Sequence, residues 1–141
     1  MQRSEQERVR RDSLATLRKM GIEPYPAAEF VATHRSNALA ESFEDGKEVT
    51  LAGRLMNRRI MGKASFAVLQ DSEGTAQLYL NRDEMCPGED KSMYNDVFKK
   101  LLDRGDFIGI QGTTFTTKTG EQSVKVKTLT VLSKSLKPLP S

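Results

Sequence analysis

The spacing of hydrophobic residues changes once along the chain, from a helical period to strict alternation. Near the N-terminus a thin apolar stripe is formed by Val9, Leu14, Leu17 and Met20. This stripe predicts a helix over about residues 4–20 whose first half is polar nearly all round. Pro24 and Pro26 follow and end it. From Val49 onward apolar and polar residues alternate, which is the pattern of β-strands.

The alternating region divides into five predicted strands and one helix. The segments VTLAGRLMN, ASFAVLQD and TAQLYL come first, followed by a helix over 94–102 and then by DFIGIQGTTF and SVKVKTLTVL. The sequence DSEG is typical of a hairpin turn. A shift of apolar phase between Val126 and Leu129 predicts a β-bulge in the last strand, and Gly53 marks a second expected bend or bulge.

Three strands, a helix and two strands follow one another in the order of the OB-fold, a five-stranded Greek-key barrel. We therefore predict a mainly β protein with an N-terminal helix and a helix between strands 3 and 4. The predicted regions are an N-terminal helix and Pro-rich turn over 1–26, a connector with a short helical turn over 27–48, a barrel over 49–133 and a linker over 134–141.

Composition excludes several classes of protein. The 141 residues suit one domain, and no apolar run approaches the roughly 18 residues that a membrane span requires. The N-terminus lacks the apolar segment of a secretory signal, so a cytoplasmic location is expected. Cys86 has no partner for a disulfide, and His34 has no second ligand at a metal-binding spacing. We expect no catalytic residue, metal or cofactor in this segment.

Positive charge is concentrated although the net charge is only +3. Cations gather in three segments: residues 8–19, 54–63 and 118–137. Such clusters favour a polyanionic partner, although a solvated charged surface without a partner explains them equally well. In the first segment Arg8, Arg10 and Arg11 lie in the polar half of the helix, which should stand away from the core and could meet an anion.

The hairpin predicts which side chains face outward. If Asp71 opposes Gly74 across the turn, Phe66 faces Tyr79 and Val68 faces Gln77 on the outer side of the sheet. The core side then carries the pairs Ala67–Leu78 and Leu69–Ala76. The ring of Phe66 is out of step with its apolar neighbours because it belongs to a binding face.

An exposed ring beside cations suits an unpaired nucleic acid strand. A base stacks on such a ring for about 1–3 kcal/mol, while arginine and lysine neutralise phosphates. Gln77 offers both a donor and an acceptor to a base edge, and Arg59 offers donors. Three alternatives remain: the N-terminal helix covers Phe66 and Tyr79, the face binds another protein, or the barrel binds single strands without sequence preference.

Long motifs carry a family resemblance that covers nearly the whole chain. They are AGRLMNRRIMGKASFAVLQD with QLYL, YNDVFKK, DFIGIQGTTFTTKTGE and KSLKPLP. On these motifs the chain resembles the N-terminal anticodon-binding domain of bacterial class II lysyl-tRNA synthetases. The resemblance implies that Phe66 stacks on the central anticodon uridine, that Arg59 and Gln77 contact its edges, and that Glu121 helps to bind a neighbouring base. Possible supporting RNA contacts are Arg58, Lys63, Tyr79, Arg8 and Arg11.

The same resemblance implies a larger parent enzyme. That enzyme attaches lysine to its tRNA with ATP and Mg²⁺ in a catalytic domain, and it is a homodimer. We expect this segment to be a domain of such an enzyme, inactive alone, with the tRNA anticodon loop as its partner. Aspartyl- and asparaginyl-tRNA synthetases have a similar domain and are the nearest alternative.

Overall fold

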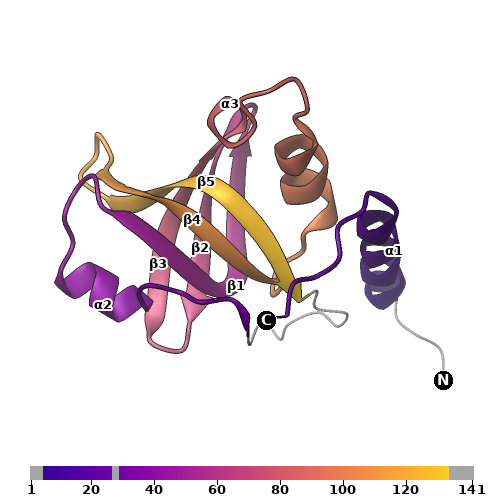
Figure 1. Ribbon diagram of the computed structural model, residues 1–141, viewed down its shortest axis with the longest axis horizontal. Coiled ribbons are helices and arrows are strands. Elements are labelled where there is room, and N and C mark those ends of the chain that lie inside the picture. The colour runs from indigo at the N-terminus through magenta and orange to yellow at the C-terminus, as the bar shows by residue number, and fades with distance from the viewer. Residues whose placement is uncertain (1–4, 27–28, 134–141) are drawn as a thin grey trace.

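A closed five-stranded barrel forms the centre of the computed structural model, which describes residues 5–26 and 29–133 (Figure 1). The strands are β1 (Glu48–Met61), β2 (Ala64–Asp71), β3 (Gly74–Asn81), β4 (Phe107–Thr116) and β5 (Gln122–Ser133). They follow the order β1-β2-β3-β5-β4, and only the β3–β5 pairing is parallel. The predicted OB barrel is therefore confirmed.

Four helices accompany the described barrel: α1 (Glu5–Lys19), α2 (Ser36–Glu41), α3 (Arg82–Met85) and η2 (Met93–Leu101), which is a π-helix. The predicted helix between strands 3 and 4 is confirmed as η2. The short α3 was not predicted, although Asn81 is a strong N-cap residue and its side chain accepts from the backbone N–H groups of Asp83 and Glu84. The predicted linker over 134–141 lies outside the described residues.

Helix α1 packs against η2 and not against the hairpin of β2 and β3 (Figure 1). The alternative in which the N-terminal helix covers Phe66 and Tyr79 is therefore wrong. The expectation that the first half of this helix stands clear of the protein is also wrong at Arg10. Its side chain is 8% exposed and donates to the carbonyl oxygen of Arg104 at 3.1 Å.

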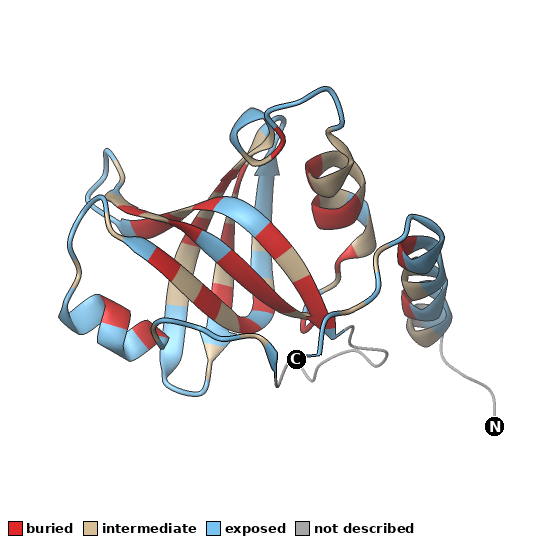
Figure 2. Cartoon of the chain, in the orientation of Figure 1, coloured by how far each residue is buried: buried red, intermediate tan, exposed pale blue. Residues whose placement is uncertain are grey.

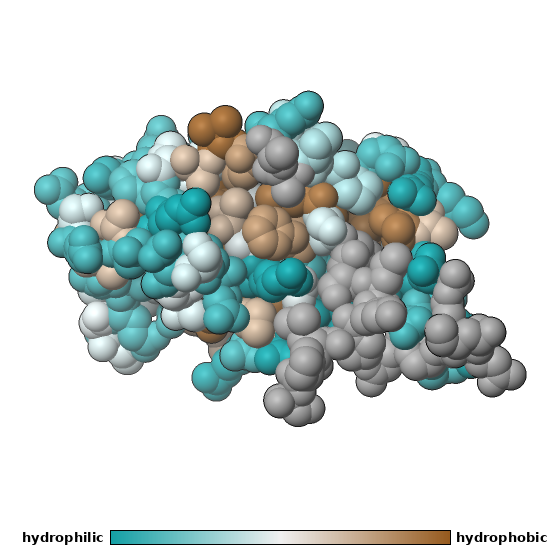
Figure 3. All heavy atoms as spheres, turned by 90° about the horizontal axis from the view of Figure 1, so that it is seen from below, coloured by the Kyte–Doolittle hydropathy of each residue, from teal (hydrophilic) through white to brown (hydrophobic). Residues whose placement is uncertain are grey.

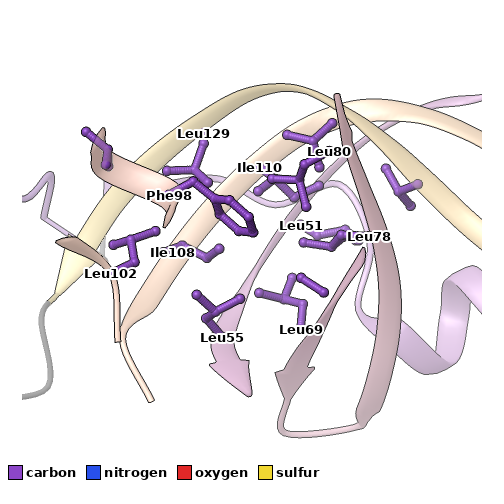
Figure 4. Packing of buried hydrophobic residues seen from close by; sticks show 14 of the residues in the cluster. Leu51, Leu55, Leu69, Leu78, Leu80, Phe98, Leu102, Ile108, Ile110 and Leu129 are labelled. Atoms are coloured by element: carbon purple, nitrogen blue, oxygen red, sulfur yellow. The ribbon is translucent and has the colours of Figure 1, made fainter. Parts of the chain in front are cut away.

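Alternation along the strands separates the core from the surface, as the banding of buried and exposed residues in Figure 2 shows. The inward side chains meet the apolar side of η2, so that Phe98 lies among the strand residues Leu55, Ile108 and Leu129 (Figure 4). Fully burying one such side chain contributes roughly 1.5–3 kcal/mol. The packed core therefore keeps the strands that form the outer face in fixed positions.

The bulge in β1 lies later than predicted. Its pairing with β2 shifts between Leu55 and Asn57, whereas Gly53 pairs regularly with Ile108 of β4. Gly53 has a different role, since a Cβ atom there would lie 2.5 Å from the carbonyl oxygen of Gln70. The glycine thus permits a close approach of two strands.

The predicted bulge in β5 is confirmed. Gln111 pairs with Thr128 and Gly112 with Val126, which leaves Lys127 as the extra residue. The two strands can therefore bend around the barrel while Val126 and Leu129 both stay buried.

Candidate nucleic-acid interface

The outer face of the hairpin has the predicted register. Phe66 pairs with Tyr79 and Val68 with Gln77, while Ala67 and Leu78 pair on the buried side. Arg59 of β1 pairs with Phe66, so Arg59, Phe66 and Tyr79 form one row across three strands. A ring, a guanidinium and a carboxamide therefore meet on one partly exposed surface.

A shallow pocket of about 140 Å³ lies at this row and is lined by Asn57, Arg58, Arg59, Phe66, Ala67, Val68 and Gln77. The three residues expected to contact a base thus share one hollow. Arg59 is exposed, whereas Phe66 and Gln77 are half-buried. Strand pairing fixes their backbones, so little order must be gained on binding.

Aromatic rings continue the row beyond Phe66. Its ring centroid lies 5.3 Å from that of Tyr79, and Tyr79 lies 5.7 Å from Phe115 of β4. The Lys125 ammonium lies 5.6 Å from the centroid of the Phe115 ring. Phe115 and Lys125 could not be assigned to this surface from the sequence, because their approach to Tyr79 depends on barrel closure between β3 and β5.

Glu121 is brought to the edge of the same surface by the turn between β4 and β5. Its carboxylate accepts from the Thr119 hydroxyl at 2.7 Å and also from Gln77, which together hold the pKa of Glu121 below its usual value. The structure therefore brings Glu121 close to Gln77, as an ionised acceptor at neutral pH.

Arg58 has contacts different from those of its neighbour. Its guanidinium donates to the carbonyl oxygen of Phe98 and lies 5.8 Å from the centroid of the Phe98 ring. Burial lowers the pKa of Arg58, while the charges of Asp103 and Asp106 act in the opposite direction. Although Arg58 lines the pocket, its charged group is directed toward η2.

The other predicted cations lie further from the pocket residues in the fold. Lys63 is exposed in the turn after β1. Arg8 and Arg11 are exposed on α1, where Arg8 forms an ion pair with Glu5 at 2.9 Å. Since α1 packs on η2, the structure does not bring these arginines to the hairpin face.

A larger pocket, about 850 Å³, lies elsewhere and includes none of the predicted RNA-binding residues. Its lining comprises Phe30, Ala32, Thr33, His34, Arg35, Ala52, Arg54, Gln70, Asp71, Ser72 and Phe107. Viewed from below, apolar side chains also gather on the surface among hydrophilic ones (Figure 3). The larger volume therefore does not coincide with Arg59, Phe66 and Gln77, which the sequence predicts to contact RNA and which line the smaller pocket.

The described residues form neither a cluster of metal ligands nor a helix that could span a membrane. No group of three or more His, Cys, Asp or Glu side chains there is arranged to hold a metal ion. Each helix in that part of the chain is too short or too polar to cross a lipid bilayer.

A small closed barrel that presents an aromatic row beside cations on its hairpin face defines the class of OB-fold nucleic-acid-binding modules. The sequence comparison agrees with this class. The chain belongs to the family of OB-fold nucleic acid binding domains named for the tRNA anticodon, which it matches over residues 49–132.

The curated proteins that resemble this chain over nearly its whole length include several lysine–tRNA ligases. The chain is 61% identical over 139 residues to the lysine–tRNA ligase of Christiangramia forsetii, covering 99% of this chain and 24% of the relative. It is 53% identical over 142 residues to that of Porphyromonas gingivalis (97% and 25%) and 49% identical over 134 residues to that of Moorella thermoacetica (94% and 26%). The predicted resemblance is confirmed, and the chain spans about a quarter of the length of these curated relatives.

Proposed function

We propose that this domain binds the anticodon loop of lysine tRNA and reads its central uridine. The observation that carries the proposal is the meeting of Arg59, Phe66 and Gln77 in one pocket on the outer face of the barrel. The lysine–tRNA ligase relatives support lysine tRNA as the RNA in question.

The three side chains match the chemistry of uracil. A base stacked on the Phe66 ring gains about 1–3 kcal/mol. Uracil presents two carbonyl acceptors and one N–H donor, which the Arg59 guanidinium and the Gln77 carboxamide can satisfy. Cytosine carries an amino group in place of one carbonyl, so the amino donor of the base would face a donor of Arg59 or Gln77. This mismatch should cost about 1–3 kcal/mol.

The surrounding groups extend the proposed surface. Glu121 accepts from the neighbouring base, and Tyr79 supports the Phe66 ring, which lies 5.3 Å away. Lys63, Arg8 and Arg11 attract the phosphates at longer range, since all three are exposed cations. Arg58 supports the surface through its contact with Phe98.

The domain would serve a larger enzyme, since the relatives are about four times longer than this chain. That enzyme would be a dimer in the cytoplasm and would attach lysine to its tRNA, using ATP and Mg²⁺ bound by a catalytic part outside this chain. Alone, the domain would bind RNA without charging it. An aspartyl or asparaginyl enzyme has no observation in its favour here.

A direct test compares two RNA hairpins carrying the lysine anticodon loop, one with the central U and one with C. Fluorescence anisotropy titrations should give a dissociation constant about 5- to 150-fold higher for the C hairpin, the range that corresponds to 1–3 kcal/mol. Equal affinities for both hairpins would contradict base reading. Equal binding of unrelated single strands, with steep salt dependence, would indicate a non-specific module.

The variant Phe66→Ala identifies the stacking surface, and Tyr25→Ala is its matched control. Tyr25 is 44% exposed but lies outside the pocket. The first variant should weaken binding of the U hairpin about 5- to 150-fold through the lost stacking, and the second should leave it unchanged. If Phe66→Ala alters self-association while RNA binding stays intact, the face is a protein-binding surface instead.

A further inference from the structure

The hydroxyl group of Ser123 in β5 is buried next to the outer face of the hairpin. Among the described residues, the Ser123 Oγ is the buried side-chain oxygen or nitrogen atom that lacks a hydrogen-bond partner. Ser123 is only 1% exposed. Buried hydroxyl groups are nearly always paired, so an unpaired one indicates a bound water or ligand.

Ser123 lies beside the proposed reading residue. It is the register partner of Gln77 across the short parallel pairing of β3 with β5, and of Phe115 across β4. The pairing of β3 with β5 begins at this row, and α2 packs on β3, with the Ser36 hydroxyl next to Gly74 at the start of that strand. An opening therefore remains between β3, β5 and α2.

That opening is a small pocket of about 100 Å³, lined by Ser36, Leu39, Ala40, Phe43, Thr75, Ala76, Gln77, Gln122, Ser123 and Val124. Since one water occupies about 30 Å³ in the liquid, the pocket has room for a few waters. Ser123, Gln77 and Gln122 supply polar partners for them, while Leu39 and Phe43 give the pocket an apolar wall. A bound water needs such convergent polar groups.

Gln77 lines both this pocket and the one that contains Phe66. Its carboxamide can therefore contact a base on one side and a water on the other. The orientation of the carboxamide matters, because a half-turn exchanges its donor and its acceptor. Uracil and cytosine differ by the same exchange, so a freely turning Gln77 would accommodate either base.

We propose that Ser123 is a positioning residue that acts through a bound water: the water joins the Ser123 Oγ to the Gln77 carboxamide and fixes the orientation that reads uracil. Its effect on base choice rests on the proposed function. Glu121 contacts Gln77 from the turn between β4 and β5, so the carboxamide is held by two groups. Ser123 sets specificity without touching the RNA.

Ser123→Ala tests the role in reading, and Ser65→Ala is the matched control. Ser65 is also fully buried, but its hydroxyl pairs with the Tyr94 hydroxyl at 2.7 Å, away from Gln77. Ser123→Ala should lower the ratio of U-hairpin to C-hairpin affinity about fivefold, the factor for one ordinary hydrogen bond. Ser65→Ala should lower the melting temperature and leave the ratio unchanged. An unchanged ratio in Ser123→Ala, or an equal loss for both hairpins, overturns the proposal.

A second measurement needs no RNA. In the free protein, the side-chain amide protons of Gln77 should show an NMR cross-relaxation signal to a long-lived water, and Ser123→Ala should abolish it. Absence of that signal in the wild type overturns the proposal. If the signal is present but the wild type binds both hairpins equally, the proposed function fails while the water link stands, so the two failures are distinguishable.

Discussion

Two adjacent arginines show how the hairpin face differs from the core end of the barrel. Arg59 is exposed and shares a pocket with Phe66, whereas the guanidinium of Arg58 donates to the Phe98 carbonyl of η2. The Tyr94 hydroxyl of η2 is likewise paired within the protein, with the Ser65 hydroxyl and the Gly62 carbonyl oxygen. On the hairpin face, Arg59 and Phe66 are left available for a ligand.

The β1 bulge produces this division. Alternation from the outward Arg54 without interruption would place Arg58 outside and Arg59 inside. The register shift between Leu55 and Asn57 exchanges the two sides, so Arg59 pairs with the outward Phe66. A single extra residue therefore decides which arginine is turned toward η2 and which lies on the outer face beside Phe66.

The largest expected effect comes from truncating the aromatic residue at the core end. Phe98 is fully buried and carries the Arg58 contact, so Phe98→Ala should lower the free energy of unfolding by about 3–5 kcal/mol. The half-buried Phe66 should cost under about 1.5 kcal/mol when replaced by Ala, because less apolar area is lost. Denaturant titrations measure both. A similar cost for the two variants would remove the distinction between the regions.

Replacing each of the two arginines should give effects of intermediate size, one on the stability of the fold and the other on RNA binding. Arg58→Ala should destabilise the fold by about 1.5–3 kcal/mol, since it removes a hydrogen bond from a charged group and leaves the Phe98 carbonyl oxygen unpaired. Arg59→Ala should change stability by less than about 0.5 kcal/mol. Its loss should instead weaken U-hairpin binding by about 1–3 kcal/mol.

Arg104→Ala, which removes another exposed guanidinium, is the control for general charge effects. Denaturant titration and RNA titration of the same samples separate the two quantities. The division between the regions is wrong if Arg58→Ala weakens RNA binding in proportion to Arg59→Ala while the fold keeps its stability.

Local patterns in the sequence predicted the barrel and the hairpin register. Alternation correctly predicted that Phe66 and Gln77 face outward, because the DSEG turn fixes which residues pair. The phase shift between Val126 and Leu129 located the β5 bulge, since both residues must be buried. In these places the information lies in neighbouring residues.

The sequence did not locate the features that depend on strands meeting across the barrel. Gly53 was the visible signal for a bulge in β1, but this glycine is needed where Gln70 comes close. The Tyr79–Phe115 contact and the buried hydroxyl of Ser123 follow from closure between β3, β4 and β5. The expected contact of Glu121 with a base came only from the family resemblance, because Glu121 lies in a turn that strand alternation does not place on the hairpin face.

The smallest expected change in stability concerns Asp71, at the turn end of the β2–β3 hairpin. Its carboxylate holds α2 through polar contacts. The Asp71 carboxylate accepts from the backbone N–H and the hydroxyl of Ser36, each at 2.7 Å. Burial acts to raise the pKa of Asp71, but these hydrogen bonds and one from the Glu73 N–H outweigh it, so the net pKa is lowered. Asp71→Asn keeps one acceptor oxygen and replaces the other with a donor, so it should cost about 1 kcal/mol at neutral pH, as for the loss of one hydrogen bond.

The pH dependence of this loss follows from the lowered pKa of Asp71. Because the folded pKa lies below the unfolded value of about 3.9, the contribution of the carboxylate is complete above that pH and disappears as the pH falls through the folded pKa. The stability difference between wild type and Asp71→Asn should therefore shrink as the pH is lowered below about 4. Asp12→Asn, which removes an exposed carboxylate from α1, is the control for net charge. A difference that stays constant down to low pH would show that the carboxylate does not hold α2.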